Sequence, residues 1–172
     1  LLGIEEVHAM GGAQAVAALD ADAAVRSIVI TGGDAVFAAG ADLNLLVDKG
    51  AQDVADIDLG QFWAPVANSR KPVIAAVSGF ALGAGCELAM MCDFIVADAS
   101  ARLGQPELAV GIMPGAGGTQ RLVRTVGKQV ASLMLLTGEQ LSGERAFQLG
   151  LVAELAPAGE TLARALELAK KA

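Results

Sequence analysis

The sequence contains no tyrosine, and aromatic residues make up only 3% of its 172 positions. Proteins that bind single-stranded nucleic acid rely on aromatic side chains for base stacking and on clustered lysine and arginine for phosphate contacts. Basic residues are also few, 12 against 19 acidic ones, which gives a formal net charge of −7. We therefore expect no nucleic-acid partner.

Histidine and cysteine are equally scarce. His8 is the only histidine, and Cys86 and Cys92 fit neither a metal motif nor a disulfide framework. We predict no metal site and two buried free thiols, which are typical of a reducing compartment. The first nineteen residues lack the basic start and the clean apolar centre of a signal peptide. These features favour a cytoplasmic protein.

Apolar residues are abundant, at 54% of the chain, and 21 glycines accompany them. The longest apolar run is short and interrupted by glycine, so we expect no membrane partner. A chain of this length can bury a substantial core and is most simply one domain over residues 1–172. Small residues dominate, which favours close packing of helices on strands and sites lined by backbone.

Apolar and β-branched runs alternate with helical patterns along the chain. The predicted strands are Val25–Thr31, Val73–Val77, Phe94–Ala97 and Leu151–Leu155. Helices are predicted over residues 1–19, around Phe62 and Trp63, and over 86–92, 119–137, 144–149 (with Ser142 as N-cap) and 160–172. Glycine-rich loops are predicted at 37–42, 79–85 and 114–118. This alternation predicts an α/β fold with mostly parallel strands.

Two carboxylates stand in apolar, glycine-rich surroundings. Glu87 follows Gly83-Ala84-Gly85-Cys86 and begins an apolar stretch, and Glu107 follows Gly104-Gln105-Pro106. An ionised group in such a place must be paired, hydrogen-bonded or shifted in pKa. Two carboxyls of tunable pKa are what general acid–base chemistry needs. The alternatives are that Glu87 stabilises its own helix dipole and that Glu107 is a turn residue.

The glycine loops match known nucleotide-binding and hydrolase motifs poorly. After Gly83-Ala84-Gly85, Leu88 stands where a dinucleotide fingerprint has its third glycine. The stretch Gly115–Gln120 lacks the Gly-Lys-Ser/Thr ending of a P-loop, and Ser78 lacks the glycine two positions before it that a nucleophile elbow needs.

The loops 37–42 and 83–85 carry almost no side chain, so a ligand oxygen can approach their backbone N–H groups closely. Two such groups that converge on one point form an oxyanion hole. The alternative, that both are merely tight turns, stays open on composition alone.

Four motifs together resemble the crotonase, or enoyl-CoA hydratase/isomerase, superfamily. They are Ala38–Leu43, Pro72–Asp93, Leu103–Glu107 and Met113–Leu122, in the order and spacing of that family. The resemblance covers roughly residue 24 to the end. It implies a crotonase-like spiral of ββα units with surrounding helices, assembled as a homotrimer or a dimer of trimers. Family members usually carry further segments at both ends, so we expect the core domain to be incomplete at each end.

Carried over by position, the resemblance implies a complete set of site residues. The N–H groups of Ala41 and Ala84 would form the oxyanion hole, and Glu87 and Glu107 the acid–base pair. Position 84 is more often glycine in the family, but alanine keeps the N–H. The remaining substrate-binding positions would be Ala38, Ala39, Gly40, Asp42, Leu43, Gly83 and Gly115.

The implied reaction is addition of water to a trans-2-enoyl-CoA. Coenzyme A is then part of the substrate, and no separate cofactor is expected. Alternatives are double-bond isomerisation or another acyl-CoA reaction on the same scaffold, and a non-catalytic assembly module. Arg70, Lys71, Arg102 and Arg121 are candidates for the CoA phosphates by charge alone, with solvated surface residues as the alternative.

Overall fold

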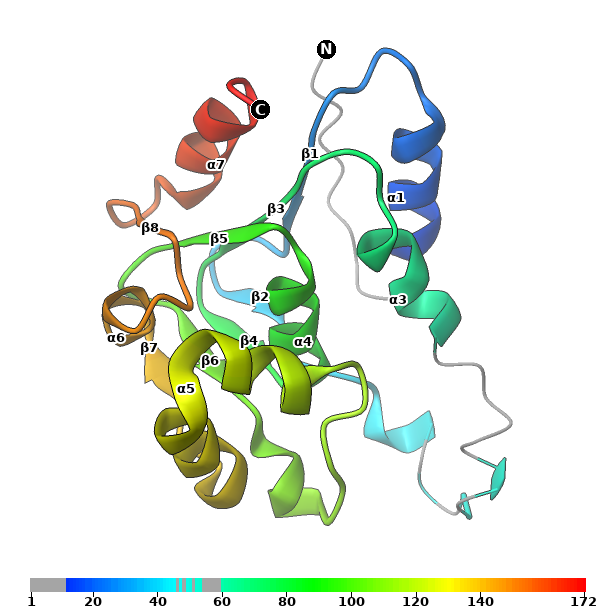
Figure 1. Cartoon of the computed structure of the whole chain (residues 1–172), viewed down its shortest axis with the longest axis vertical. Helices are drawn as coiled ribbons and strands as arrows, with labels where there is room; N and C mark the ends of the chain where they lie inside the picture. The colour runs from blue at the N-terminus through cyan, green and yellow to red at the C-terminus, as the bar shows by residue number, and fades with distance from the viewer. Residues whose placement is uncertain (1–11, 46, 48, 51, 54–59) are drawn as a thin grey trace.

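The computed structural model describes residues 12–45, 47, 49, 50, 52, 53 and 60–172 (Figure 1). Most of the helix predicted over residues 1–19 lies outside the described residues. The part that is described forms α1 (Gly12–Ala21).

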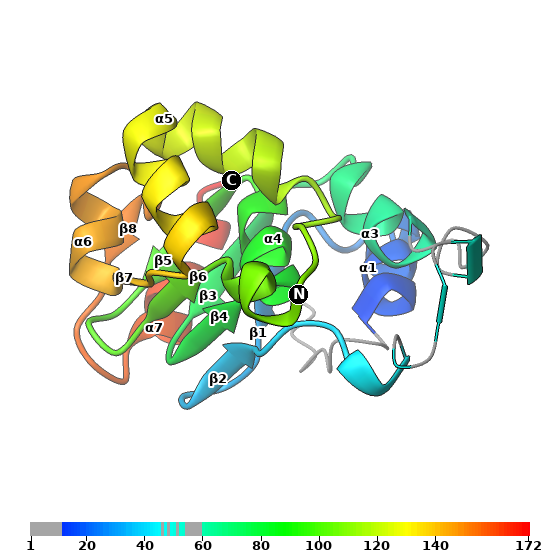
Figure 2. The same ribbon diagram turned by 90° about the horizontal axis from the view of Figure 1, so that it is seen from below.

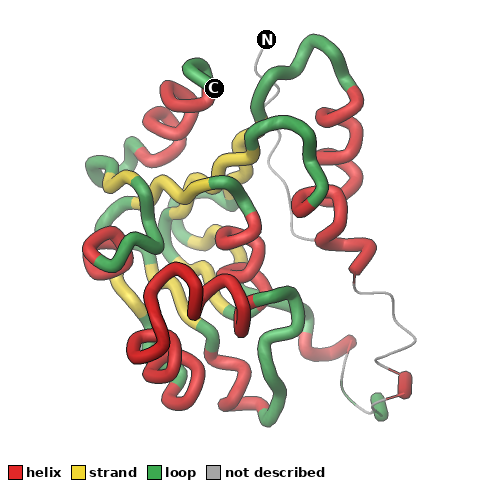
Figure 3. Tube along the Cα trace, in the orientation of Figure 1, coloured by secondary structure: helices red, strands yellow, loops and turns green. Residues whose placement is uncertain are grey.

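Two four-stranded sheets form the centre of the molecule (Figure 3). The first has the order β1-β3-β5-β8, all parallel, with bounds Ile28–Thr31, Val73–Val77, Phe94–Ala97 and Glu154–Leu155. The second has the order β2-β4-β6-β7, with bounds Val36–Ala38, Phe80–Leu82, Arg102–Gly104 and Leu141–Ser142, and only its last pair is antiparallel. The successive pairs β1–β2, β3–β4 and β5–β6 each add one strand to the first sheet and one to the second, so the chain advances as a spiral.

Helices surround this spiral (Figure 2). They are α3 (Gly60–Ala67), α4 (Ala84–Met91), α5 (Gly118–Thr137, kinked at Gly127), α6 (Gly143–Gln148) and α7 (Thr161–Ala169), with 3-10 turns η1 (Leu43–Leu45) and η2 (Pro106–Val110). Ser142 caps α6 as predicted, because its hydroxyl accepts from the N–H of Arg145. None of the helices in the described part of the chain is long and apolar enough to cross a bilayer.

The prediction missed most of the second sheet. The loops predicted at 37–42 and 79–85 instead contain the ends of β2 and all of β4, and β6 and β7 had no predicted counterpart. These strands have two or three residues each, too few to show an alternating pattern. The strand predicted over Leu151–Leu155 is shortened to the two residues of β8, and Val25–Thr31 to the four of β1.

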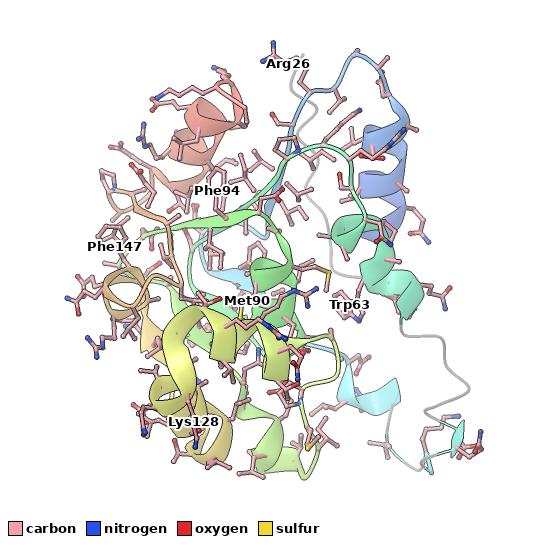
Figure 4. The ribbon with its side chains drawn as sticks, in the orientation of Figure 1. Arg26, Trp63, Met90, Phe94, Lys128 and Phe147 are labelled. Carbon is pink, nitrogen blue, oxygen red and sulfur yellow. The ribbon has the colours of Figure 1, made fainter. Side chains whose placement is uncertain are left out.

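The core lies on both faces of the first sheet. All five residues of β3 are buried, so its apolar run has no alternation, as expected for a parallel strand covered on both sides. On one face Val73, Ala75 and Val77 join the larger core, against which Trp63 of α3 and Met90 of α4 also pack (Figure 4). On the other face a smaller cluster joins β1, β3 and β5 to α7. Cys86 and Cys92 are buried free thiols, as predicted.

A buried aspartate ties α7 to the first sheet. Asp98 is 3% exposed, and its Oδ2 accepts from the hydroxyls of Ser78 and Thr161, each at 2.8 Å. Its Oδ1 accepts from the N–H and hydroxyl of Ser100. Burial acts to raise the pKa of Asp98, but the hydrogen bonds from Ser100, Ser78 and Thr161 outweigh it and hold the pKa below its ordinary value. The carboxylate is therefore ionised and fully satisfied.

Thr161→Val removes one donor to this carboxylate while it keeps the shape of the side chain. We expect it to lower the free energy of unfolding at pH 7 by about 1.5–3 kcal/mol, the usual range for a hydrogen bond to a charged group. A folded-state pKa below the unfolded one means that this stabilisation is present above the unfolded pKa and is lost as pH falls through the folded pKa. Urea unfolding of both proteins across pH measures this.

The matched control is Thr125→Val, which removes an exposed hydroxyl that donates only to the Arg121 carbonyl within α5. If Thr161→Val is no less stable than this control at neutral pH, Asp98 does not anchor α7.

Candidate active site

Glu87 is held by a loop that lies 29 to 31 residues further along the chain. It lies in the first turn of α4 and is 2% exposed. Its Oε1 accepts from the N–H groups of Ala116, at 2.8 Å, and Gly118, at 2.7 Å. Its place in the first turn of α4 also allows the alternative role, stabilising the dipole of its own helix. Its hydrogen-bond donors, however, come from the loop before α5 and from the first residue of α5.

The conformation of residues 115–118 explains why two donors converge on one oxygen. Gly117 has φ 99° and ψ 9°, in the left-handed region that favours glycine. Successive N–H groups around such a residue form a concave nest that binds an anion. A β-carbon on Gly118 would lie 2.9 Å from Glu87 Oε1 and 2.8 Å from Gln105 Oε1, so the carboxylate needs glycine at this position.

The side chain of Glu107, which belongs to η2, lies near the start of α4, the helix that carries Glu87. A β-carbon on Gly83, the residue before α4, would lie only 3.3 Å from Glu107 Oε1. Glu107 Oε2 is buried and accepts no hydrogen bond within the described part of the chain. Glu107 does stand in a turn after Pro106, the alternative considered from the sequence, but one of its carboxylate oxygens is buried there.

Burial raises the pKa of both carboxyls. For Glu87, hydrogen bonds from Gly118 and Ala116 and the positive charge of Arg121 act against burial without outweighing it. For Glu107, burial is again the largest cause, and the negative charge of Glu87 raises its pKa further. Both carboxyls are therefore desolvated, and the charge of Glu87 acts on the titration of Glu107.

The two small-residue loops adjoin each other. A β-carbon on Gly85 would lie 2.0 Å from the carbonyl oxygen of Ala38, so only glycine allows this contact. A β-carbon on Gly40 (φ 111°) would lie 3.9 Å from the backbone nitrogen of Ala84. Ala84 is the first residue of α4, where an N–H has no partner within the helix. The structure thus places the segment that carries Ala41 beside Ala84.

The other predicted substrate-binding residues lie at the exposed end of this region. Asp42 accepts from the backbone N–H and side-chain amide of Asn44, at 2.9 and 2.8 Å, and so shapes the start of η1. Leu43 is 47% exposed. Nothing lies within 4 Å of a β-carbon built on Gly115. Within the described residues no group of three potential metal-binding side chains occurs.

Two residues of the motifs have contacts that the sequence pattern does not reveal. Gln105 is 1% exposed, and its Nε2 donates to the Gly83 carbonyl at 3.3 Å while its Oε1 is unpartnered in the described chain. Arg121 donates to the Ala116 carbonyl at 2.8 Å. Both positions stand inside the quoted motifs, but their contacts depend on loop conformation, which no spacing rule specifies.

The other three basic candidates for CoA phosphates also bind within the chain. Arg70 pairs with Asp20 at 3.2 Å. Lys71 donates to the carbonyl of Leu19 in α1 and to that of Asp22 just after it, and Arg102 donates to the carbonyls of residues 99–101. Their role toward a phosphate stays a prediction.

Comparison with known proteins identifies the family. The model of the enoyl-CoA hydratase/isomerase family matches residues 8–172, and the chain belongs to this family. It is 52% identical over 150 residues to the 2,3-dehydroadipyl-CoA hydratase of Escherichia coli K12 and 48% identical over 158 residues to the mitochondrial enoyl-CoA hydratase of Pongo abelii. The matches cover 87% and 92% of this chain but 59% and 54% of those proteins, so the chain spans a little over half of their length.

Solved structures confirm the crotonase fold expected from the motifs. DspI of Pseudomonas aeruginosa superimposes with a TM-score of 0.88 at 34% identity, covering 99% of this chain and 72% of that one. An enoyl-CoA hydratase of Bacillus anthracis gives a TM-score of 0.83 at 36% identity, covering 92% of this chain and 62% of that one.

Gly118→Ala tests whether the loop holds the Glu87 carboxylate. The added β-carbon would push Oε1 away from its donor. We expect the pKa of Glu87 to rise further and the free energy of unfolding to fall by about 1–3 kcal/mol, as for other overpacked sites. Carbon-13 NMR of the glutamate carboxyls, titrated with pH, and chemical denaturation measure the two effects.

Gly115→Ala is the matched control, because its new methyl group would meet open space. It should leave both quantities unchanged. Equal behaviour of the two variants would contradict the described packing of the loop on Glu87.

Proposed function

We propose that this chain carries the catalytic core of an enoyl-CoA hydratase, which adds water reversibly to a trans-2-enoyl-CoA to give a 3-hydroxyacyl-CoA. The observation that supports this most is the pair of desolvated carboxyls: burial raises the pKa of Glu87 and of Glu107, the charge of Glu87 raises that of Glu107 further, and Glu107 lies beside Gly83 at the start of α4. Family membership and hydratase relatives at about half sequence identity support the same reaction.

The thioester oxygen would accept hydrogen bonds from the N–H groups of Ala41 and Ala84. As water adds at C3, the electrons of the double bond move toward C2 and the thioester oxygen, which becomes an enolate oxygen. Two fixed N–H dipoles stabilise that charge more than they stabilise the neutral carbonyl, so they lower the barrier. Ala84 is suited to this role because its N–H stands at a helix start, without an intrahelical partner.

The carboxyls would move the protons. Glu87, ionised and held through Oε1, would take a proton from the attacking water, whose oxygen bonds to C3. Glu107, protonated, would give its proton to C2 and leave an uncharged 3-hydroxyacyl product. A raised pKa suits Glu107 to the role of acid, and its Oε2 has no hydrogen-bond partner within the described chain. Proton exchange between the coupled pair then restores the starting state.

The rest of the assignment is proposed with this reaction. Coenzyme A would enter as part of the substrate, with no other cofactor, and the active protein would be a cytoplasmic homotrimer or dimer of trimers. Isomerisation on the same scaffold is the nearest alternative, and the retention of two glutamates favours the hydratase. The substrate would be lined by small or exposed residues: Ala38, Ala39, Gly40, Asp42, Leu43, Gly83 and Gly115.

Glu87→Gln and Glu107→Gln should each lose about 10²–10⁴-fold in kcat, because each removes a group that transfers a proton in the transition state. Hydration of crotonyl-CoA is measured by the loss of absorbance of the conjugated thioester. Binding of an acyl-CoA to each variant, measured by calorimetry, should persist.

The wild-type rate should follow a bell-shaped pH profile. Activity falls at low pH as Glu87 takes up a proton and at high pH as Glu107 loses one, and both limbs should lie above the ordinary value of 4.5 because burial raises both pKa values. Full turnover in both glutamine variants would refute the acid–base assignment.

Ala84→Pro deletes one N–H of the proposed oxyanion hole at a helix position that tolerates proline. We expect a loss of about 10²–10³-fold in kcat, which is typical of losing one such donor. Circular dichroism and the fluorescence of Trp63 serve as controls for folding. A correctly folded variant with wild-type kcat would show that this N–H does not stabilise the enolate.

A further inference from the structure

Arg121 contacts the loop that holds Glu87. It lies in the first turn of α5 and is half-buried. Its Nη1 donates to the Ala116 carbonyl at 2.8 Å, and its backbone N–H donates to the Gly117 carbonyl at 2.8 Å. Within the described part of the chain no carboxylate lies within ion-pair distance of it.

The two sets of contacts alternate along the loop. The N–H groups of Ala116 and Gly118 donate to Glu87, and the carbonyl of Ala116, which lies between them in the chain, accepts from Arg121. That carbonyl belongs to the peptide group between the two whose N–H groups bind Glu87, so the arginine and the carboxylate contact consecutive peptide groups of the loop. One loop conformation therefore satisfies both the arginine and the glutamate.

Gly117 provides the space for this contact. A β-carbon at Gly117 would lie 2.2 Å from Arg121 Nη1, so a larger residue would displace the guanidinium. The left-handed conformation of Gly117 both shapes the nest for Glu87 and opens the side from which Arg121 reaches the loop.

We propose that Arg121 is a positioning residue for Glu87: it holds residues 115–118 in the conformation that directs two N–H groups at the carboxylate. Its catalytic consequence rests on the proposed hydratase function. Its structural consequence does not, because the hold on Glu87 exists with or without a substrate.

Among the described residues few titratable or charged groups face Glu87, so the pKa of Glu87 reports on its contact with the loop that Arg121 holds. They are Glu107 from η2, the Cys86 thiol from α4 and Arg121 from α5. Burial raises the pKa of Cys86 to about 12, so the thiol stays neutral over the working range. Arg121 is the only cation among these three groups, and both its charge and the loop it holds favour the ionised form of Glu87.

The test compares Arg121→Met, Arg121→Lys and Arg124→Met in the 172-residue chain. Arg124 is the matched control, because it is an exposed arginine on the same helix that bonds only within it, to Gln120. The first readout is the pKa of Glu87 by carbon-13 NMR of its carboxyl, assigned through Glu87→Gln. We expect Arg121→Met to raise it, Arg121→Lys to raise it less, and Arg124→Met to leave it unchanged.

The second readout is crotonyl-CoA hydration. In Arg121→Met we expect kcat to fall about 10-fold, less than the 10²–10⁴-fold expected when the proton-transferring group itself is lost. The low-pH limb of the rate profile should move to higher pH, and KM should stay unchanged.

Several results would overturn the inference. One is a Glu87 that titrates alike in Arg121→Met and Arg124→Met. Another is a raised KM at unchanged kcat, which would make Arg121 a substrate contact. If Arg121→Met does not fold, the titration of Arg121→Lys decides in the same way. If the wild type hydrates no crotonyl-CoA while the Glu87 titration still moves, the proposed function fails and the positioning role stands.

Discussion

The hold of two backbone N–H groups on one buried carboxylate is the contact on which the site depends. An ionised carboxylate without partners in the interior would cost several kcal/mol or lose its charge. Ala116 and Gly118 satisfy Glu87 and at the same time join the start of α5 to α4. The same bonds act against the effect of burial, which raises the pKa of Glu87. Packing and chemistry are set here by the same two donors.

The lack of a side chain at Gly85 and Gly40 is the second constraint on the site. The contact of Gly85 with the Ala38 carbonyl and of Gly40 with the region around Ala84 brings two strand-to-helix segments together. The spiral makes this possible, because β2 and β4 are parallel neighbours in one sheet and the loops that follow them leave from the same end of that sheet. A methyl group at Gly85 would separate them. The fold therefore produces a backbone-lined site through the positions where a side chain is missing.

Parts of this structure can be predicted from the sequence, and others cannot. The strand Val73–Val77 is predictable because a short, fully apolar run rich in β-branched residues favours a buried strand, whereas β4 and β6 are three-residue strands among glycines. Glu87 and Glu107 stand out because charge is unusual in such surroundings. The contacts of Gln105 and Arg121 depend on the direction of individual peptide groups, and residue type and spacing do not encode that direction.

The attachment of α7 has a consequence for how the protein is made. Its first residue, Thr161, bonds to Asp98, 63 positions earlier, and the carbonyl of Ala169 accepts from Ser27, 142 positions earlier. One face of the first sheet has its apolar residues Ile74, Ala76 and Val96 covered only when α7 has been synthesised. During translation these apolar residues stay exposed to solvent until α7 has left the ribosome. Contacts between residues so far apart in the sequence also form slowly. A nascent chain stalled before residue 161 would be a natural client for a chaperone.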